Sequence, residues 1–135
     1  MIFPYLDNEP IIPLEMKAKN GEWLEFHAYI DSGAGFSVFH SDHAEVLGIK
    51  LQSGRKIFFT VGNGEKIPAY VHRIPVKFAR KEFLAEVAFS TSLGVGTNLL
   101  GLASFFENFS ICFQHGKKHV EIKELIEMYK QQSHK

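Results

Sequence analysis

The feature that most constrains the fold is an alternation of side chains on either side of Asn20-Gly21. Residues 12–16 and 24–30 carry apolar side chains at every second position. Successive side chains of a β-strand point to opposite faces, so this pattern predicts two strands that each bury one face. Asn and Gly both tolerate positive φ, which predicts a type I′ hairpin turn between the two strands.

Short strand-like segments and turns recur along the rest of the chain. Pro68 and Pro75 indicate that parts of one long segment lie at a sheet edge. Many short strands joined by close turns favour a small barrel or a sandwich over a parallel α/β sheet. Further strands are expected at residues 36–39, 56–61, 66–78, 83–89, 99–101, 109–113 and 119–122.

Few segments have helical character. A short helix is expected at Asp42–Leu47, where Asp42 caps the first turn, Glu45 completes a capping box and Gly48 ends the helix. Residues 103–108 indicate one more helical turn. Residues 123–132 place apolar side chains at helical spacing, which predicts an amphipathic C-terminal helix. The expected fold class is therefore mostly β, with one or two short helices and a C-terminal helix.

The length of 135 residues argues for a single domain, residues 1–135. Within it, residues 1–10, which contain Pro4, Asn8 and Pro10, are expected to form an irregular arm, and residues 123–135 a helical tail. The thirteen Phe residues either fill one dense core or leave apolar surface for a partner subunit.

Composition argues against several classes of function. Fifteen basic and fifteen acidic residues give a formal net charge of zero, which offers no electrostatic attraction for nucleic acid or an anionic membrane. No segment approaches the roughly 18 apolar residues of a membrane-spanning helix. The N-terminus lacks the basic and apolar regions of a signal peptide, so we expect a cytoplasmic protein.

The residues that often carry metal or thiol chemistry give little signal. The single cysteine, Cys112, excludes an intrachain disulfide and is expected to be a small buried side chain. The His residues form no HExxH pattern, and we expect no metal and no cofactor. His40 and His43 lie on either side of Ser41, but no nucleophile elbow accompanies them, and a role at the helix cap is the better interpretation.

Asp31 is the candidate catalytic residue. It directly follows the apolar strand that ends at Ile30 and begins the loop Ser32-Gly33-Ala34. The small residues leave room beside the carboxylate for a second backbone and for a substrate. Gly33 can adopt backbone angles that other residues avoid, and Ser32 can donate a hydrogen bond or cap the turn. Taken alone, Asp-Ser-Gly is also a common surface turn after a strand.

Two further features accompany this loop. The segment Leu99-Leu100-Gly101 follows far downstream, and a glycine-tipped hairpin, Val61–Tyr70, lies between the two. The run Tyr29–Ala34 resembles the apolar–Asp–Thr/Ser–Gly–Ala motif of retropepsin-like aspartic proteases, and Leu99-Leu100-Gly101 resembles their second motif. The resemblance covers residues 12–122, with the parts in the same order and at similar spacing.

The resemblance implies a small closed acid-protease barrel and an aspartic endopeptidase. In that class two carboxylates hold the attacking water and share one proton. This chain supplies only Asp31, so the second carboxylate would come from another copy in a homodimer that acts on a peptide or protein substrate. Ser32 would bond across the dimer, Gly33 would contact the substrate backbone, and the flap residues Gly62, Asn63 and Gly64 would close over the peptide. The alternative is an inactive peptide-binding or dimerisation module with the same fold.

The chain departs from the family pattern at several positions. Ser32 replaces the commoner Thr but keeps the hydroxyl. Gly35 and Leu102 stand where retroviral members often have an acidic residue and an Arg that pair. The C-terminal tail extends past the usual end, which argues against dimerisation through interleaved termini. Ala34, Leu100 and Leu102 either line substrate subsites or belong to the core.

Overall fold

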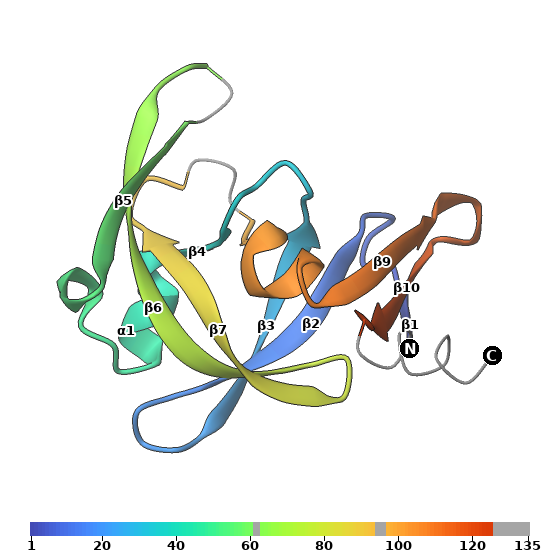
Figure 1. Ribbon diagram of the computed structural model, residues 1–135, viewed down its shortest axis with the longest axis horizontal. Helices are drawn as coiled ribbons and strands as arrows, with labels where there is room; N and C mark the ends of the chain where they lie inside the picture. Colours follow the sequence, from blue (N-terminus) through green and yellow to red (C-terminus); the bar gives the residue numbers. More distant parts are fainter. Residues whose placement is uncertain (61–62, 94–96, 126–135) are drawn as a thin grey trace.

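The computed structural model describes residues 1–60, 63–93 and 97–125, and in it the two alternating segments form paired strands (Figure 1). β2 (Ile11–Lys17) and β3 (Trp23–Ile30) run antiparallel, with Ile11 opposite Tyr29 and Lys17 opposite Trp23. Every second residue of β2 is buried. The alternation therefore predicted both the strands and the buried face correctly.

The turn between β2 and β3 is longer than a type I′ turn, so that prediction was wrong. Ala18 donates its N–H to Glu22 O at 2.8 Å, and Gly21 donates to Ala18 O at 2.9 Å. Gly21 has a φ of 93°, whereas Asn20 stays outside the positive-φ region. This is a type I turn followed by a left-handed glycine. The Asn20 side chain instead accepts the N–H of Glu22 at 2.9 Å.

The larger sheet closes on itself. Its strand order is β2-β3-β8-β4-β7-β6-β5, and β2 pairs in addition with β6 at Glu15–Lys77 and Met16–Val76. β6 is 13 residues long, which lets it pair with β5, β7 and β2 along its length. The mostly β fold with a small closed barrel is thus confirmed. Its other strands are β4 (Ser37–His40), β5 (Arg55–Thr60), β6 (Lys66–Phe78), β7 (Lys81–Ser90) and β8 (Leu99–Leu100).

The two ends of the described chain lie together in a second sheet (Figure 1). β1 (Ile2–Pro4), β10 (His119–Glu124) and β9 (Phe109–Gln114) pair antiparallel in the order β1-β10-β9. Residues 2–4 are therefore a strand rather than part of an irregular arm, because β10 supplies the partner that a three-residue segment cannot reveal by periodicity. β10 also continues through Lys123 and Glu124, where the helical tail was expected to begin. The part of that tail from residue 126 lies outside the described residues.

The helical segments are short. α1 (Ser41–Val46) begins one residue earlier than expected, because the ring of His40 rather than Asp42 caps it by accepting the N–H of Asp42 at 3.1 Å. Gly48, with a φ of 73°, follows its C-terminal end as expected. The turn expected at residues 103–108 is irregular, with a φ of 68° at Ser104. The single turns are η1 (Leu51–Ser53), η2 (Leu102–Phe106) and η3 (His115–Lys117). No helix in the described ranges is long and apolar enough to span a membrane.

One hydrophobic cluster joins the barrel to the second sheet. Phe78 of β6 stacks on Phe3 of β1 and packs edge-on against Phe109 of β9, with ring centroids 6.3 and 5.0 Å apart. Most Phe side chains serve the core, and Phe58 and Phe113 are the two that are exposed. Cys112 is also exposed, against expectation, and it lies on β9, an edge strand of the second sheet, next to the exposed Phe113.

Candidate active site

Asp31 lies directly after β3 in a loop that hydrogen bonds fix in place. Its N–H donates to Leu100 O at 2.9 Å, and Ala34 N–H donates to Asp31 O at 3.2 Å. The carboxylate oxygen Oδ1 accepts the N–H of Gly33 at 2.8 Å. Asp31 is half-buried, while Ser32 and Gly33 are exposed. The loop therefore holds one carboxylate oxygen against its own backbone, next to exposed residues.

β8 holds this loop in place by pairing with the end of β3. It runs parallel to β3, with Tyr29 opposite Leu99 and Ile30 opposite Leu100. It also runs antiparallel to β4, with Val38 opposite Leu99. The structure thus brings the two motifs predicted from the sequence into direct contact, although most of the barrel separates them along the chain.

Gly101 is the point of closest approach between the two motifs. A Cβ at this position would lie 2.5 Å from Ala34 O and 2.5 Å from Phe36 O. Its N–H donates to Oγ of Ser37 at 2.9 Å, and Ser37 is completely buried. Only glycine fits at this position, because both contacted oxygens belong to the main chain.

Gly35 and Leu102, which replace the acidic residue and the Arg of retroviral members, each take part in main-chain hydrogen bonds between the two motifs, although not with each other. Leu102 N–H donates to Ala34 O at 2.8 Å, and Ala103 N–H donates to Gly35 O at 2.9 Å. Leu100 is completely buried, whereas Leu102 is 41% exposed and Ala34 is half-buried. Of the three candidate subsite residues, Leu100 therefore belongs to the core.

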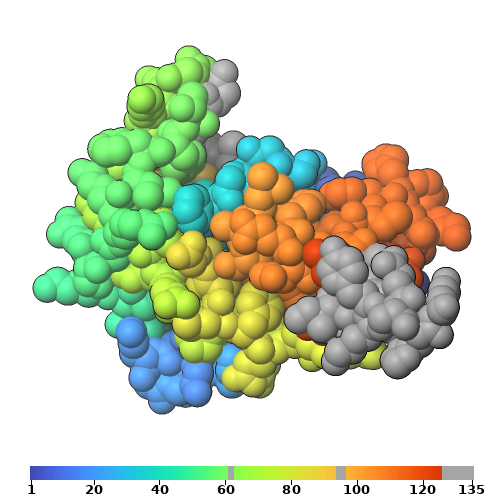
Figure 2. All heavy atoms as spheres, viewed as in Figure 1, coloured from blue at the N-terminus to red at the C-terminus, as the bar shows by residue number. Residues whose placement is uncertain are grey.

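The candidate flap is the tip of the β5–β6 hairpin. Gly62 lies outside the described residues, and Asn63 Oδ1 accepts the N–H of Glu65 at 2.9 Å. The next residue, Gly64, has a φ of 85°. Figure 1 shows this hairpin rising beyond the barrel at the same end as the loop that follows β3. Figure 2 shows that it protrudes from the surface of the molecule.

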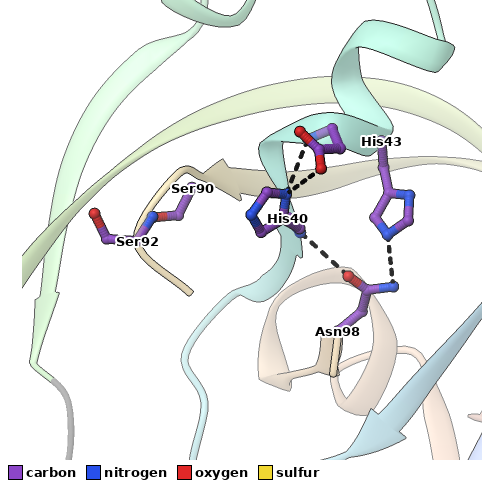
Figure 3. A network of polar contacts seen from close by, with 6 residues as sticks. His40, His43, Ser90, Ser92 and Asn98 are labelled. Atoms are coloured by element: carbon purple, nitrogen blue, oxygen red, sulfur yellow. Dashed lines mark hydrogen bonds and ion pairs between the residues drawn. The ribbon is translucent and has the colours of Figure 1, made fainter. Parts of the chain in front are cut away.

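A polar network holds the residue that precedes β8 (Figure 3). Asn98 Oδ1 accepts the N–H of His40 at 3.2 Å, and Nδ2 donates to His27 O at 3.1 Å. Nδ2 also lies 3.2 Å from Nε2 of His43. The main-chain oxygen of Asn98 accepts the N–H of Tyr29 at 2.8 Å. One side chain thus connects β8 to α1, β3 and the end of β4.

The surroundings of His43 favour its neutral ring. Burial lowers the pKa of His43, and the nearby His40 acts in the same direction. Asp42 opposes this change, and a hydrogen bond with Asn98 would also raise the pKa if the amide oxygen faced the ring. The ring packs edge-on against Phe26 and Phe39, with centroids 5.1 and 6.1 Å away.

A cleft of about 370 Å³ lies elsewhere, between the N-terminal strands and the β6–β7 turn. Phe3, Leu14 and Arg80 are among its lining residues, and none of the candidate site residues lines it. Within the described ranges, no three His, Cys, Asp or Glu side chains are grouped so that they could hold a metal ion.

Two residues that build the site were missed in the sequence. Ser37 interrupts an apolar strand, and Asn98 directly precedes Leu99. A lone polar residue inside or beside an apolar strand is a usable signal, because a buried polar side chain needs a hydrogen-bond partner. The sequence does not indicate which partner it finds.

The fold is similar to those of solved aspartic proteases. No protein-family model and no curated protein matches the sequence. A retropepsin-like aspartic protease from Rickettsia conorii matches with a TM-score of 0.65 and 20% identity, over 91% of this chain and 97% of that one. The EIAV protease, in complex with the inhibitor HBY-793, matches with a TM-score of 0.52 and 18% identity, over 71% of this chain and 84% of that one. The chain therefore has a retropepsin-like fold.

Proposed function

We propose that the chain is an aspartic endopeptidase, which hydrolyses peptide bonds with a water activated by two Asp31 carboxylates, one from each subunit of a homodimer. The observation that carries the proposal is the braced loop at Asp31. A carboxylate follows β3, its Oδ1 is fixed by the N–H of Gly33, and its N–H is fixed by Leu100 O. This arrangement occurs in a fold shared with two aspartic proteases.

The need for a second copy follows from the number of carboxylates. Asp31 is the only Asp or Glu within residues 31–36 and 98–103, the two segments that build the site. Activation of water by this class of enzyme requires two carboxylates that share a proton. A two-fold axis beside Asp31 would supply the second one from an identical loop.

In the proposed reaction, one Asp31 carboxylate removes a proton from the water while its mate donates a proton to the scissile carbonyl oxygen. The exposed Ser32 and Gly33 are then covered, Ser32 by the partner loop and Gly33 by the substrate backbone. The hairpin tip that includes Asn63 and Gly64 closes over the peptide and excludes water.

The first experiment replaces the proposed catalytic group. Asp31→Asn should reduce peptide cleavage by at least about a hundredfold, because the amide cannot exchange the required proton. Glu22→Gln is the matched control, since Glu22 is an exposed carboxylate in the β2–β3 turn, at the opposite end of β3 from Asp31, and its replacement should leave the rate unchanged. Unchanged cleavage in Asp31→Asn would refute the assignment, and peptide binding without cleavage by the native chain would identify a binding module instead.

The second experiment tests assembly. If each chain supplies half of the site, activity and dimer content should fall together on dilution. A stable dimer is expected to bury on the order of 1,600 Å² in total. Sedimentation and cleavage rates measured over one concentration series check this, and a fully active monomer would contradict the shared site.

A further inference from the structure

Two main-chain groups of opposite character hold the side-chain amide of Asn98 in one orientation. Its Oδ1 faces the N–H of His40, and its Nδ2 faces the carbonyl of His27. A half-turn of the amide would place its NH₂ group against an N–H and its oxygen against a carbonyl, so both hydrogen bonds would be lost. The backbone therefore decides which Asn98 atom meets the ring of His43.

That atom is Nδ2, which lies 3.2 Å from Nε2 of His43 (Figure 3). An amide nitrogen only donates, so Nε2 must accept, and it accepts only in a neutral ring whose proton is on Nδ1. The reversed amide, with its oxygen toward Nε2, would favour the charged ring, but His40 and His27 exclude that orientation. A proton on Nε2 places two donors against each other and breaks the contact.

Few charged groups act on this ring. On α1 itself these are His40, which disfavours a proton on His43, and Asp42, which favours it. β3 and β4 contribute the Phe26 and Phe39 rings, and His27 of β3 takes part through its carbonyl. The other elements packed on α1 are η1, which contains no ionisable residue, and the end of β7 at Ser90, where β4 pairs with it.

The contact between Asn98 and His43 can affect the Asp31 loop because Asn98 directly precedes β8, the strand that bonds this loop. β8 has two residues, so few main-chain bonds hold it. Asn98 O accepts the N–H of Tyr29 at 2.8 Å, and Leu100 O accepts the N–H of Asp31 at 2.9 Å. Asn98 therefore directly precedes the strand that bonds the Asp31 backbone, and its own carbonyl adds one more bond to β3.

We propose that His43 and Asn98 form a proton-sensitive link that positions β8 beneath the Asp31 loop. The link is closed while the His43 ring is neutral, and a proton on Nε2 opens it. Asn98 is thus a positioning residue, and His43 is the group through which acid weakens that positioning. Its effect on catalysis rests on the proposed function, whereas the link itself does not.

The native chain tests the link by NMR titration of the His43 ring, without substrate. At neutral pH, Nε2 of His43 should carry no proton. On acidification, the side-chain amide of Asn98 and the backbone amide of Tyr29 should shift with the same midpoint as His43. A proton on Nε2 at neutral pH, or Asn98 signals that do not follow His43, would overturn the proposal.

Variants give a second measurement. Asn98→Ala removes the donor that favours the neutral ring, so the His43 midpoint should rise by about 0.5–1 pH unit, which corresponds to one hydrogen bond. Gln114→Ala is the matched control, because Gln114 also contacts a histidine ring, that of His119, but on the second sheet. It should leave the His43 midpoint unchanged. An unchanged midpoint in Asn98→Ala would contradict the link, and if that variant does not fold, the native titration decides.

The effect of the link on catalysis is tested separately, by the pH dependence of peptide cleavage. Peptide cleavage by the native chain should fall as the pH drops through the His43 midpoint, and this fall should be absent in Asn98→Ala. An identical acid limb in both proteins would overturn the effect on catalysis, even where the titration supports the link. Asp31→Asn tests the proposed function separately, so the two failures are distinguishable.

Discussion

Gly101→Ala tests the packing of the two motifs against each other. The added methyl group would lie 2.5 Å from Ala34 O, 2.5 Å from Phe36 O and 2.7 Å from Phe36 C. All three are main-chain atoms, so no side-chain rotation relieves the overlap. The loop that holds Asp31 or the strand that supports it must move instead.

The cost can be estimated from this geometry. Overpacking typically destabilises a protein by about 1–3 kcal/mol, and three main-chain contacts place this substitution in the upper part, about 2–3 kcal/mol. At about 3–4 °C per kcal/mol for a chain of this length, the Tm should fall by about 6–12 °C. Differential scanning calorimetry or thermal circular dichroism measures this directly.

Gly116→Ala provides the control. A Cβ at Gly116 meets nothing within 4 Å, so its stability should change by less than about 1 kcal/mol in either direction. If Gly101→Ala is as stable as Gly116→Ala, the close approach at Gly101 does not constrain the fold, and the reasoning is refuted.

Three further predictions concern stability. Phe105→Ala empties a fully buried position, so urea unfolding should show a loss of about 3–5 kcal/mol, against under about 1 kcal/mol for the exposed Phe113→Ala. Ala79 and Arg80 have φ values of 49° and 66° in the β6–β7 turn. Joint Ala79→Asn and Arg80→Gly substitution should therefore raise the free energy of unfolding, measured in urea, by about 1–2 kcal/mol. Because the pKa of His43 is lowered in the folded chain, the unfolded chain binds more protons at mildly acidic pH. The neutral His43 ring therefore stabilises the fold fully above pH 6.5, and this stabilisation is lost as the pH falls through the folded pKa. Urea midpoints measured against pH should show the loss, and His43→Leu should lack it.

The sequence predicted most of the barrel because its strands are amphipathic. β2 and β3 have a period of two, and that period reports directly on a sheet with one buried face. The errors fall where local pattern carries no such information. β1 has three residues, and the cap of α1 is a histidine ring, a residue type outside the usual set of Ser, Thr, Asp and Asn.

The site was predicted as two motifs but not as a connected structure, and the length of β8 explains why. A long strand is positioned by its ladder of main-chain bonds, which periodicity predicts. β8 has two residues, so its position depends on side chains around it: Ser37 binds the N–H of Gly101, and Asn98 binds the backbone of His27 and His40. These partners are 58 to 71 residues apart in the chain. Each contact joins two single polar groups across the barrel, so only the closed fold could identify it. Under the proposed link, a change at His43 reaches Asp31 through the contacts of Asn98 and β8.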